Sequence, residues 1–308
     1  MRLMESSIRI GTRGSKLALI QTEAVLSRLR LINPDANFKI LQIRSGGDEF
    51  PEEKIESIGI GAFTSKLEQA LVEQRIDIAV HSLKDLPTTQ MQEVITIPVL
   101  EREDPRDVLV NRWGKTLLDL PEGARIGTSS TRRAAQLLHG AKHLKFLDIR
   151  GNVETRIQKS SGDNYDGVII AAAGVKRLGM ERYISEYLSP QICTPSPGQA
   201  AIAVEVRKDD AELIGMIDQI VDIPTSVAVK AERALLQQAG GGCNIPLGAH
   251  AIMKDNSLQL FATLTEPDGS MSYRVEVTGE PNEPELLAKA AYQALIEQGA
   301  TQLLESLY

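Results

Sequence analysis

Short apolar runs alternate with segments of helical periodicity from residue 8 to residue 220. The run at residues 8–12 precedes residues 16–31, in which Leu17, Ile20 and Ala24 fall on one helical face and for which Ser15 is a candidate N-cap. Further apolar runs predict strands at residues 38–43, 76–80, 94–100, 108–110, 125–127, 144–149, 167–173 and 200–206. A chain that alternates strands and helices in this way predicts α/β domains with helices packed on the faces of their sheets.

Two segments predict that these elements form a pair of domains joined by two crossovers. We interpret the charged run at residues 101–107 as one crossover, although the run by itself is more simply a solvated loop. The proline-rich residues 190–198 are typical of a hinge or linker, after which the chain is expected to return to the first domain. The predicted first domain is residues 1–102 with 200–221, and the second is residues 103–199.

The C-terminal part of the chain has a different pattern. A helical segment at residues 227–239 leads into a glycine-rich loop. Alternating apolar residues then predict strands at 249–253, 258–264 and 273–278, with a turn signal at Pro267-Asp268-Gly269 and helices from about residue 284. Residues 222–308 are therefore expected to form a third, small α+β domain.

Composition restricts the class of protein. The 308 residues are 42% hydrophobic and 24% charged, which is ordinary for a globular protein of two or three domains. The net charge of −7 argues against a general nucleic-acid binder. Because no signal peptide or membrane-spanning run is visible, we expect a cytoplasmic protein with no membrane partner, and by default a monomer. Cys193 and Cys243 predict neither a disulfide framework nor a metal site, and Cys193 is expected to be structural.

Basic side chains recur just after the predicted strands, where ligands bind in open α/β sheets. Residues 128–133 open a helix with hydroxyls and two arginines, a combination that favours a bound carboxylate or phosphate. Helix capping would explain the hydroxyls but not both arginines. The arginines in such positions are Arg13, Arg132, Arg133, Arg150, Arg156 and Arg177. They predict a cationic site for a ligand with several anionic groups, although an individual arginine such as Arg13 could instead lie in solvent.

Two other stretches carry reactive side chains. His81-Ser82-Leu83-Lys84-Asp85 places several polar groups at the end of a buried strand, where Asp85 is a candidate for proton transfer. An ordinary charged loop is the alternative for that stretch. Cys243 follows three glycines, which allow positive φ and could present the thiol to a bulky group. The alternative there is a helix C-cap followed by an unreactive cysteine.

In this order, the motifs resemble those of the porphobilinogen deaminase family, also called hydroxymethylbilane synthases, over essentially the whole chain. The motifs that carry the resemblance are Gly11-Thr12-Arg13-Gly14-Ser15, His81-Ser82-Leu83-Lys84-Asp85, residues 101–107, residues 127–133, Arg150-Gly151-Asn152-Val153, Lys176-Arg177-Leu178-Gly179 and Gly241-Gly242-Cys243-Asn244-Ile245-Pro246. The resemblance implies two α/β domains of the type II periplasmic-binding-protein kind plus the small α+β C-terminal domain.

The resemblance also implies an activity and a cofactor. Family members join four porphobilinogens head to tail onto a dipyrromethane held by a thioether, which here would be attached to Cys243. Each addition releases ammonia, and hydrolysis then releases linear hydroxymethylbilane for porphyrin and heme biosynthesis. By similarity, Asp85 would be the catalytic carboxylate. The residues implied for the cofactor are Cys243, Lys84, Ser129, Arg132, Arg133, Arg150 and Arg156, and those for the substrate are Arg13, Ser15, Phe63, Arg150, Arg156, Arg177 and Gln199.

The chain departs from the family pattern in places. Residues 56–63 lack the lysines common in the family's lid, and Gly198-Gln199-Ala200-Ala201 stands where Gly-Gln-Gly-Ala is usual. Two other functions are considered. A non-catalytic two-domain module for a small polycarboxylate would need neither Cys243 nor Asp85. A phosphate-handling transferase would usually need a carboxylate cluster that binds a metal, and the sequence shows none.

Overall fold

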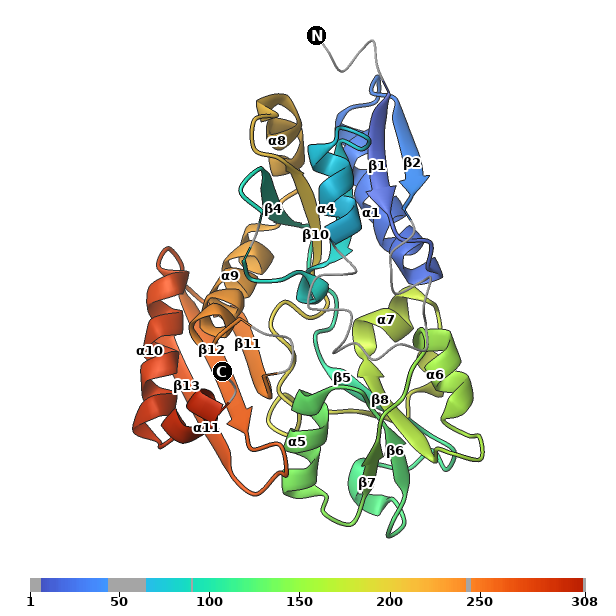
Figure 1. Ribbon diagram of the computed structural model, residues 1–308, viewed down its shortest axis with the longest axis vertical. Coiled ribbons are helices and arrows are strands. Elements are labelled where there is room, and N and C mark those ends of the chain that lie inside the picture. The colour runs from blue at the N-terminus through green and yellow to red at the C-terminus, as the bar shows by residue number, and fades with distance from the viewer. Residues whose placement is uncertain (1–6, 44–64, 90, 242–244, 307–308) are drawn as a thin grey trace. The chain divides into compact units, whose positions relative to one another are not determined.

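The computed structural model describes residues 7–43, 65–89, 91–241 and 245–306 (Figure 1). The chain divides into two compact units, Met1–Arg102 with Ala201–Ser226 and Glu103–Ala200 with Val227–Tyr308. Sheets and helices occur together in each unit, as the expected mixed α/β class requires. The division into three domains with the boundaries given above stays a prediction.

The first unit is built on a five-stranded sheet in the order β2-β1-β3-β10-β4. β1 is parallel to β2 and β3, whereas β10 is antiparallel to β3 and β4. Ile78 and Val80 join one apolar cluster and Ala79 joins another, because successive strand residues face opposite sides of the sheet. The elements are β1 (Ile8–Thr12), α1 (Lys16–Ile32), β2 (Phe38–Gln42), α4 (Ser65–Val72), β3 (Ile78–Ser82), the 3-10 helix η2 (Leu83–Asp85), β4 (Val94–Val99), β10 (Ile202–Arg207) and α8 (Ala211–Asp218).

Local contacts explain how β1 leads into α1. Ser15 caps the helix as expected, since its hydroxyl accepts a hydrogen bond from the backbone N–H of Ala18 at 3.3 Å. A Cβ at Gly11 would lie only 2.3 Å from Cδ1 of Ile76, so the close packing against β1 requires glycine. The residues that follow β1 are thus held in place by a capped helix and by tight packing behind the strand.

The second unit contains another five-stranded sheet, in the order β7-β6-β8-β5-β9. β6 is parallel to β7 and β8, and β5 is antiparallel to β8 and β9. Two apolar clusters pack around this sheet. The elements are β5 (Asp107–Asn111), η3 (Leu117–Asp119), β6 (Arg125–Gly127), α5 (Thr131–Gly140), β7 (Lys145–Leu147), α6 (Val153–Lys159), β8 (Gly167–Ala171), α7 (Ala172–Arg177), η4 (Glu181–Tyr183) and β9 (Glu186–Tyr187).

The two five-stranded sheets share one topology. In each, the second strand in the order (β1 or β6) has two parallel neighbours, and an antiparallel strand (β10 or β5) lies beyond one of them. Each antiparallel strand comes soon after the chain passes from one unit to the other. This repeated order confirms the expected pair of type II periplasmic-binding-protein-like folds.

A three-stranded antiparallel sheet, β11-β12-β13, also belongs to the second unit. α10 packs on β13 and β12 (Figure 1). The core beside this sheet contains alternate residues of β12, including Leu258, Leu260 and Ala262. The elements are α9 (Ile223–Gln238), β11 (Leu247–Lys254), β12 (Ser257–Thr265), β13 (Ser272–Gly279), α10 (Pro284–Glu297) and α11 (Thr301–Ser306). They confirm the small α+β part expected at the C-terminal end.

Some element boundaries differ from those expected from the sequence. β3 runs to Ser82, so His81 belongs to the strand rather than to the turn after it. β8 ends at Ala171, and the alanines that continue its apolar run begin α7 because alanine favours helix. The charged run at residues 101–107 is not simply a solvated loop, since Asp107 is fully buried as the first residue of β5.

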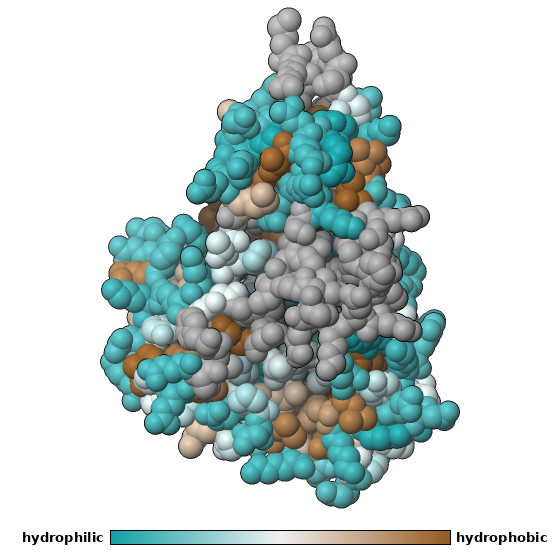
Figure 2. Space-filling view, viewed as in Figure 1, coloured by the Kyte–Doolittle hydropathy of each residue, from teal (hydrophilic) through white to brown (hydrophobic). Residues whose placement is uncertain are grey.

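The surface is mainly hydrophilic where the described residues are seen. Figure 2 shows polar residues over most of the described surface on this face, with apolar groups in scattered places. Among the more exposed apolar side chains, Leu31 belongs to the first unit and Leu118 to the second. No helix in the described part of the chain is long and apolar enough to cross a membrane.

Candidate active site

Four predicted site residues lie at one edge of the first sheet. β1 and β3 are parallel, so their carboxyl ends meet at the same edge. Arg13 and Ser15 follow β1, while Lys84 and Asp85 follow β3 within η2. Asp85 is exposed, and the other three are half-buried. The first unit therefore presents a carboxyl group beside basic side chains where α/β sheets bind ligands.

The backbone that carries Asp85 is fixed by its neighbours. Leu83 and Leu86 on either side are buried, and the N–H of Leu83 donates to the carbonyl of Ala201 at 3.0 Å. Just before η2, Ser82 Oγ accepts a 2.9 Å hydrogen bond from Nε2 of Gln21 on α1. Asp85 is thus an accessible carboxyl on a rigid support, as a catalytic group requires.

The histidine of the same motif faces inward. Nε2 of His81 lies 3.0 Å from Oε2 of Glu205 on β10, and both side chains are buried. Thr96 of β4 donates its hydroxyl to Oε1 of Glu205 at 3.0 Å. Burial, and then the charge of Glu205, raise the pKa of the buried Glu68 carboxyl on α4. These groups belong to the interior of the unit rather than to the edge that carries Lys84 and Asp85.

The second unit has a corresponding basic edge. β6 is parallel to β7 and β8, so the residues that follow these strands share one edge of the sheet. Ser129 follows β6, Arg150 follows β7, and Arg177 ends the short α7 after β8. Ser129 is exposed, whereas Arg150 and Arg177 are half-buried, as is Arg156 on α6. Hydroxyl and guanidinium donors of this kind fit a group that carries several carboxylates.

Backbone carbonyls hold several of these side chains. Nε of Arg156 donates to the carbonyl of Gly151 at 2.8 Å, and Nη2 of Arg177 donates to the carbonyl of Ala200 at 2.6 Å. Ser129 donates its hydroxyl to the carbonyl of Ile149. Arg150 has a looser contact, with Nε 3.8 Å from Oδ2 of Asp148. The guanidinium groups are thus oriented by the protein before any ligand is considered.

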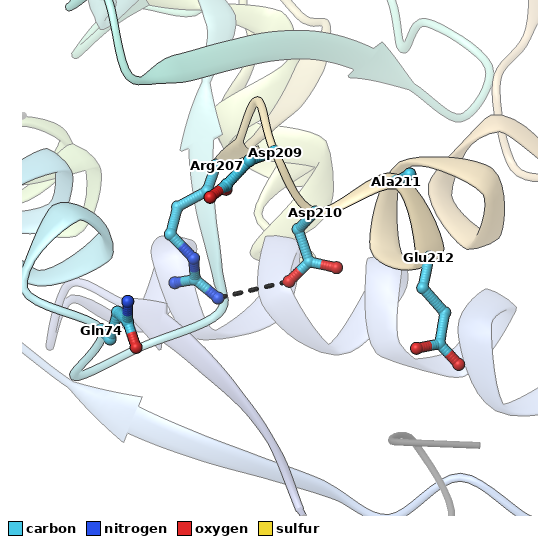
Figure 3. Close-up of a pocket in the computed structure, with 6 residues that line it drawn as sticks. All are labelled: Gln74, Arg207, Asp209, Asp210, Ala211 and Glu212. Atoms are coloured by element: carbon cyan, nitrogen blue, oxygen red, sulfur yellow. Dashed lines mark hydrogen bonds and ion pairs between the residues drawn. The ribbon is translucent and has the colours of Figure 1, made fainter.

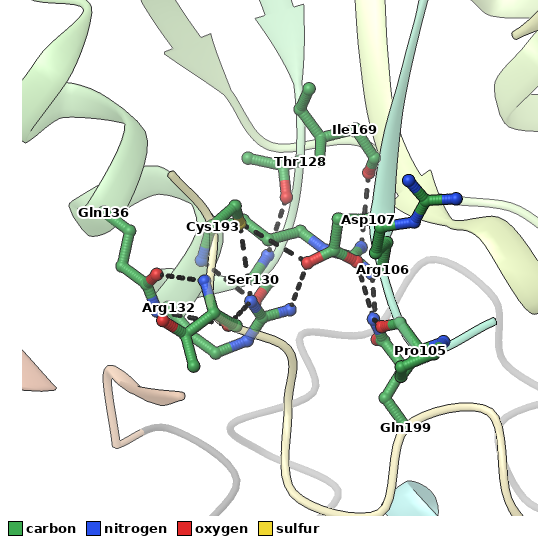
Figure 4. Close-up of polar contacts among 12 residues, drawn as sticks. Pro105, Arg106, Asp107, Thr128, Ser130, Arg132, Gln136, Ile169, Cys193 and Gln199 are labelled. Atoms are coloured by element: carbon green, nitrogen blue, oxygen red, sulfur yellow. Dashed lines mark hydrogen bonds and ion pairs between the residues drawn. The ribbon is translucent and has the colours of Figure 1, made fainter. Parts of the chain in front are cut away.

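Arg132 and Arg133 have a different environment, because both are buried and paired with Asp107. Figure 4 shows Arg132 turned toward Asp107. Nη2 of Arg132 lies 2.8 Å from Oδ2 of Asp107, and Nη2 of Arg133 lies 2.6 Å from Oδ1. Burial alone would raise the pKa of the Asp107 carboxyl, but the two guanidinium charges outweigh it and hold this pKa well below its usual range. Asp107 therefore remains ionised and neutralises one of the two positive charges.

Gln199 and Cys193 complete this buried network. Nε2 of Gln199 donates to Oδ1 of Asp107 at 2.9 Å and to the carbonyl of Pro105 at 2.7 Å. Cys193 Sγ lies 3.4 Å from Oδ2 of Asp107, and burial together with that carboxylate raises the pKa of the thiol to about 12. The Cys193 thiol is therefore neutral, and it donates to Asp107 within the buried network, as a structural cysteine would.

The buried network around Asp107 explains why two arginines stand next to each other at the start of α5, which helix capping does not explain. Ser130 caps α5 by accepting a 3.4 Å hydrogen bond from the N–H of Arg133, while the arginine side chains turn to Asp107. Sequence reasoning did not single out Asp107, although an aspartate directly before the apolar Val108 was a signal that it could be buried. The ligand-binding roles of Arg132, Arg133 and Gln199 stay predictions.

Two predicted site residues, Cys243 and Phe63, lie outside the described residues, as do residues 56–63 as a whole. The thioether attachment and the lid interpretation therefore stay predictions.

A small surface cavity of about 240 Å³ lies elsewhere in the first unit (Figure 3). Its lining consists of Gln74, Arg207, Asp209, Asp210, Ala211 and Glu212. Arg207 ends β10, which runs antiparallel to β3, so the cavity is near the beginning of β3. Nη2 of Arg207 is held by Asp77 and Asp210 at 3.1 and 3.3 Å. The cavity is thus at the sheet edge opposite Lys84 and Asp85, and it is unrelated to them.

Comparison with known families covers nearly the whole chain. Residues 8–215 match the family model "Porphobilinogen deaminase, dipyromethane cofactor binding domain", and residues 226–297 match "Porphobilinogen deaminase, C-terminal domain". A porphobilinogen deaminase of Desulforamulus reducens is 40% identical over 99% of both chains. One of Carboxydothermus hydrogenoformans is 42% identical over 99% of this chain and 98% of the relative. One of Bacillus subtilis is 38% identical over 98% and 96%.

Solved structures show weaker likenesses. The methionine-binding protein MetQ is 11% identical with a TM-score of 0.44, over 70% of this chain and 89% of its own. The BenM effector-binding domain with benzoate is 17% identical with a TM-score of 0.43, over 70% and 92%. Structural similarity at this level says nothing about activity. The full-length relatives are named as enzymes, so they do not favour the alternative of a non-catalytic binding module. The chain belongs to the porphobilinogen deaminase family, transferases with hydroxymethylbilane synthase activity that carry a dipyrromethane cofactor.

Proposed function

We propose that Asp85 is the catalytic carboxylate of this enzyme and that porphobilinogen is bound beside it by Arg13 and Ser15. The observation that carries the proposal is the exposed Asp85 carboxyl on a fixed 3-10 helix, at the same sheet edge as Arg13 and Ser15. Porphobilinogen carries an acetate and a propionate, for which guanidinium and hydroxyl groups are suitable donors. Lys84, next to Asp85, would bind a carboxylate of the cofactor.

Asp85 would act on the part of the substrate that becomes positively charged. Loss of ammonia from porphobilinogen leaves a cation, and a nearby carboxylate stabilises the charge as it develops. The same oxygen atoms can accept the proton released when the new ring becomes aromatic again. Because Asp85 is held rigidly, these interactions need little rearrangement during the reaction.

The basic edge of the second unit would hold the remaining carboxylates. When bound through Cys243, dipyrromethane supplies the pyrrole carbon to which the first substrate is joined. The side chains proposed to bind the cofactor there are Ser129, Arg132, Arg133, Arg150 and Arg156. Those proposed for the substrate in the same unit are Arg150, Arg156, Arg177 and Gln199. Asp107 neutralises part of the charge of Arg132 and Arg133. Arg150 and Arg156 would therefore add positive charge that the carboxylates of the ligand need.

Phe63 is also proposed to contact the substrate, by family similarity. We further propose that the enzyme acts as a cytoplasmic monomer on this small-molecule substrate, without nucleic acid or membrane. The first α/β domain would comprise residues 1–102 and 200–221, with residues 103–199 and 222–308 as the others. Light scattering across a range of protein concentrations tests the monomer, and a concentration-dependent mass would contradict it.

The assignment of Asp85 is tested with Asp85→Asn and a matched control, Asp35→Asn, which changes an exposed aspartate of the same unit. Asp85→Asn should keep the mass of the bound cofactor and the melting temperature of the wild type. Its turnover of porphobilinogen should fall by about 100-fold or more, the range for loss of a proton-transfer group. Asp35→Asn should behave as wild type. Turnover by Asp85→Asn within a factor of about two of wild type would contradict the proposal.

A further inference from the structure

Gln136 and Thr194 form a two-point contact between α5 and the segment that follows Cys193. Oε1 of Gln136 accepts a hydrogen bond from the N–H of Thr194 at 2.6 Å, and Nε2 donates to the Thr194 carbonyl at 3.3 Å. Both residues are buried, with exposed fractions of 2% and 1%. The amide thereby gives both polar groups of the buried Thr194 backbone a hydrogen-bond partner.

The same carbonyl receives a second donor from α5. Nη1 of Arg132 donates to the oxygen of Thr194 at 2.5 Å. Arg132 and Gln136 are four residues apart, so they lie on one face of the helix and can reach a single peptide group. Figure 4 shows Gln136 and Arg132 together beside Cys193. Thr194 is thus tied to the residue that also pairs with Asp107.

Thr194 in turn contacts the three-stranded sheet. Its Oγ1 lies 2.7 Å from Oγ1 of Thr263 on β12, and the carbonyl of Pro195 accepts a 2.9 Å hydrogen bond from the N–H of Ala249 on β11. A Cβ at Gly248 would lie 2.6 Å from the Thr194 carbonyl oxygen and 2.8 Å from Nε2 of Gln136. The backbone of β11 therefore packs directly on the contact between Gln136 and Thr194.

We propose that Gln136 is a positioning residue that fixes β11 relative to the arginines at the start of α5. In the sequence, β11 begins four residues after Cys243. The inference rests on the proposed function, in which Cys243 carries the cofactor and Arg132 and Arg133 bind its carboxylates. By fixing the position of β11, Gln136 would also determine how the thioether at Cys243 is placed relative to Arg132 and Arg133. It is not itself expected to touch the cofactor or the substrate.

The test compares purified full-length variants as they are expressed. Gln136→Met keeps a side chain of similar length but removes both hydrogen bonds, and Gln136→Glu keeps an acceptor for the N–H of Thr194. Leu137→Ala changes a buried apolar position of the same helix, in the core of the second unit, and is the control for lost stability. Intact mass gives the fraction that carries the cofactor. Steady-state kinetics normalised to that fraction give kcat and KM, and thermal melts give stability.

For Gln136→Met we expect a smaller loaded fraction and a kcat per loaded molecule lowered by about tenfold or more, because small misplacement of reacting groups is costly. KM for porphobilinogen should stay within a factor of about two, since Gln136 is not placed in the substrate site. Gln136→Glu should recover part of the kcat. Leu137→Ala should melt at a lower temperature but keep the loaded fraction and kcat of the wild type.

Two outcomes would overturn the inference. In the first, Gln136→Met has the same loaded fraction and kcat as Leu137→Ala. In the second, the kcat of Gln136→Glu is no higher than that of Gln136→Met. If Gln136→Met does not fold, Gly248→Ala takes its place, because the added methyl displaces β11 from the same contact. Gly248→Ala should then show the same fall in kcat at constant KM, and wild-type kcat would overturn the inference. A wild-type protein without cofactor mass would contradict the proposed function itself, a result distinct from any of these.

Discussion

Oδ1 of Asp107 lies 2.6 Å from Nη2 and 3.0 Å from Nε of Arg133, in a contact buried within the second unit. This ion pair, in which two N–H groups of one guanidinium donate to one oxygen, connects the first residue of β5 to the first turn of α5. Arg132 adds a further hydrogen bond to the other carboxylate oxygen. Two guanidinium groups around one carboxylate leave a net positive charge at the helix N-terminus, which still favours an anion nearby.

Asp107→Asn should destabilise the protein strongly at neutral pH. Removing one partner of a buried ion pair leaves uncompensated charge and costs about 3–5 kcal/mol. We expect urea unfolding at pH 7 to show a loss of that size, whereas Asp35→Asn, an exposed change, should stay within about 0.5 kcal/mol of wild type.

The pH dependence of this effect has a defined sign. The folded-state pKa of Asp107 is depressed, so its contribution is complete above the unfolded-state pKa of about 3.9 and is lost as pH falls below that value. The difference in unfolding free energy between wild type and Asp107→Asn should therefore narrow as the pH falls from about 5 toward 3. A difference that stays constant over this range would contradict the depressed pKa of Asp107. An Asp107→Asn variant as stable as the wild type at pH 7 would show that the pair does not stabilise the fold.

Cys193 should be inert toward alkylation in the folded enzyme. It is buried, and its thiol pKa of about 12 leaves almost no thiolate at pH 8. Iodoacetamide at pH 8 followed by peptide mapping should find no modification of Cys193 in native protein and full modification in urea. Rapid labelling of Cys193 in the native state would contradict the buried contact with Asp107, and Cys193→Ala identifies the peptide.

Glu68→Gln should stabilise the first unit at neutral and alkaline pH. Burial, and then the charge of Glu205, raise the pKa of Glu68, so folding favours its protonated form. Because the pKa of Glu68 is raised by folding, its stabilising contribution is complete below the pKa of the unfolded state. The contribution is lost as the pH rises through the pKa of the folded state. The neutral amide avoids that loss.

Thermal melts should therefore show a larger gain for Glu68→Gln at pH 8 than at pH 4. The control is Glu73→Gln, because Glu73 lies just after the same helix and is exposed. A gain for Glu68→Gln that is equal at both pH values, or a loss at pH 8, would contradict the assigned direction of the shift.

Much of the architecture could be predicted from periodicity, because strand and helix patterns are local properties of a sequence. The cap at Ser15 and the turn at Pro267-Asp268-Gly269 occur where the sequence placed them, since both depend on residues close together in the chain. The same reasoning placed basic residues after strands, and parallel pairing then brings those strand ends to a common edge.

The partners of the buried arginines could not be found in this way. Asp107 is separated from Arg132 by 25 residues, and Gln136 from Thr194 by 58, so tertiary packing alone brings them together. A pair of arginines at a helix start is compatible with a bound anion and with an internal carboxylate. The choice depends on whether another strand supplies that carboxylate, which periodicity does not show.

The central claim is that Cys243 carries a dipyrromethane, whose carboxylates the arginines bind and onto which Asp85 helps to join the substrate. The most direct measurement is the intact mass of the purified protein after denaturation, for the wild type and for Cys243→Ser. We expect the wild type to exceed its sequence mass by two linked pyrrole units, and Cys243→Ser to lack that excess. A wild-type mass equal to the sequence mass, unchanged after incubation with porphobilinogen, would contradict the claim.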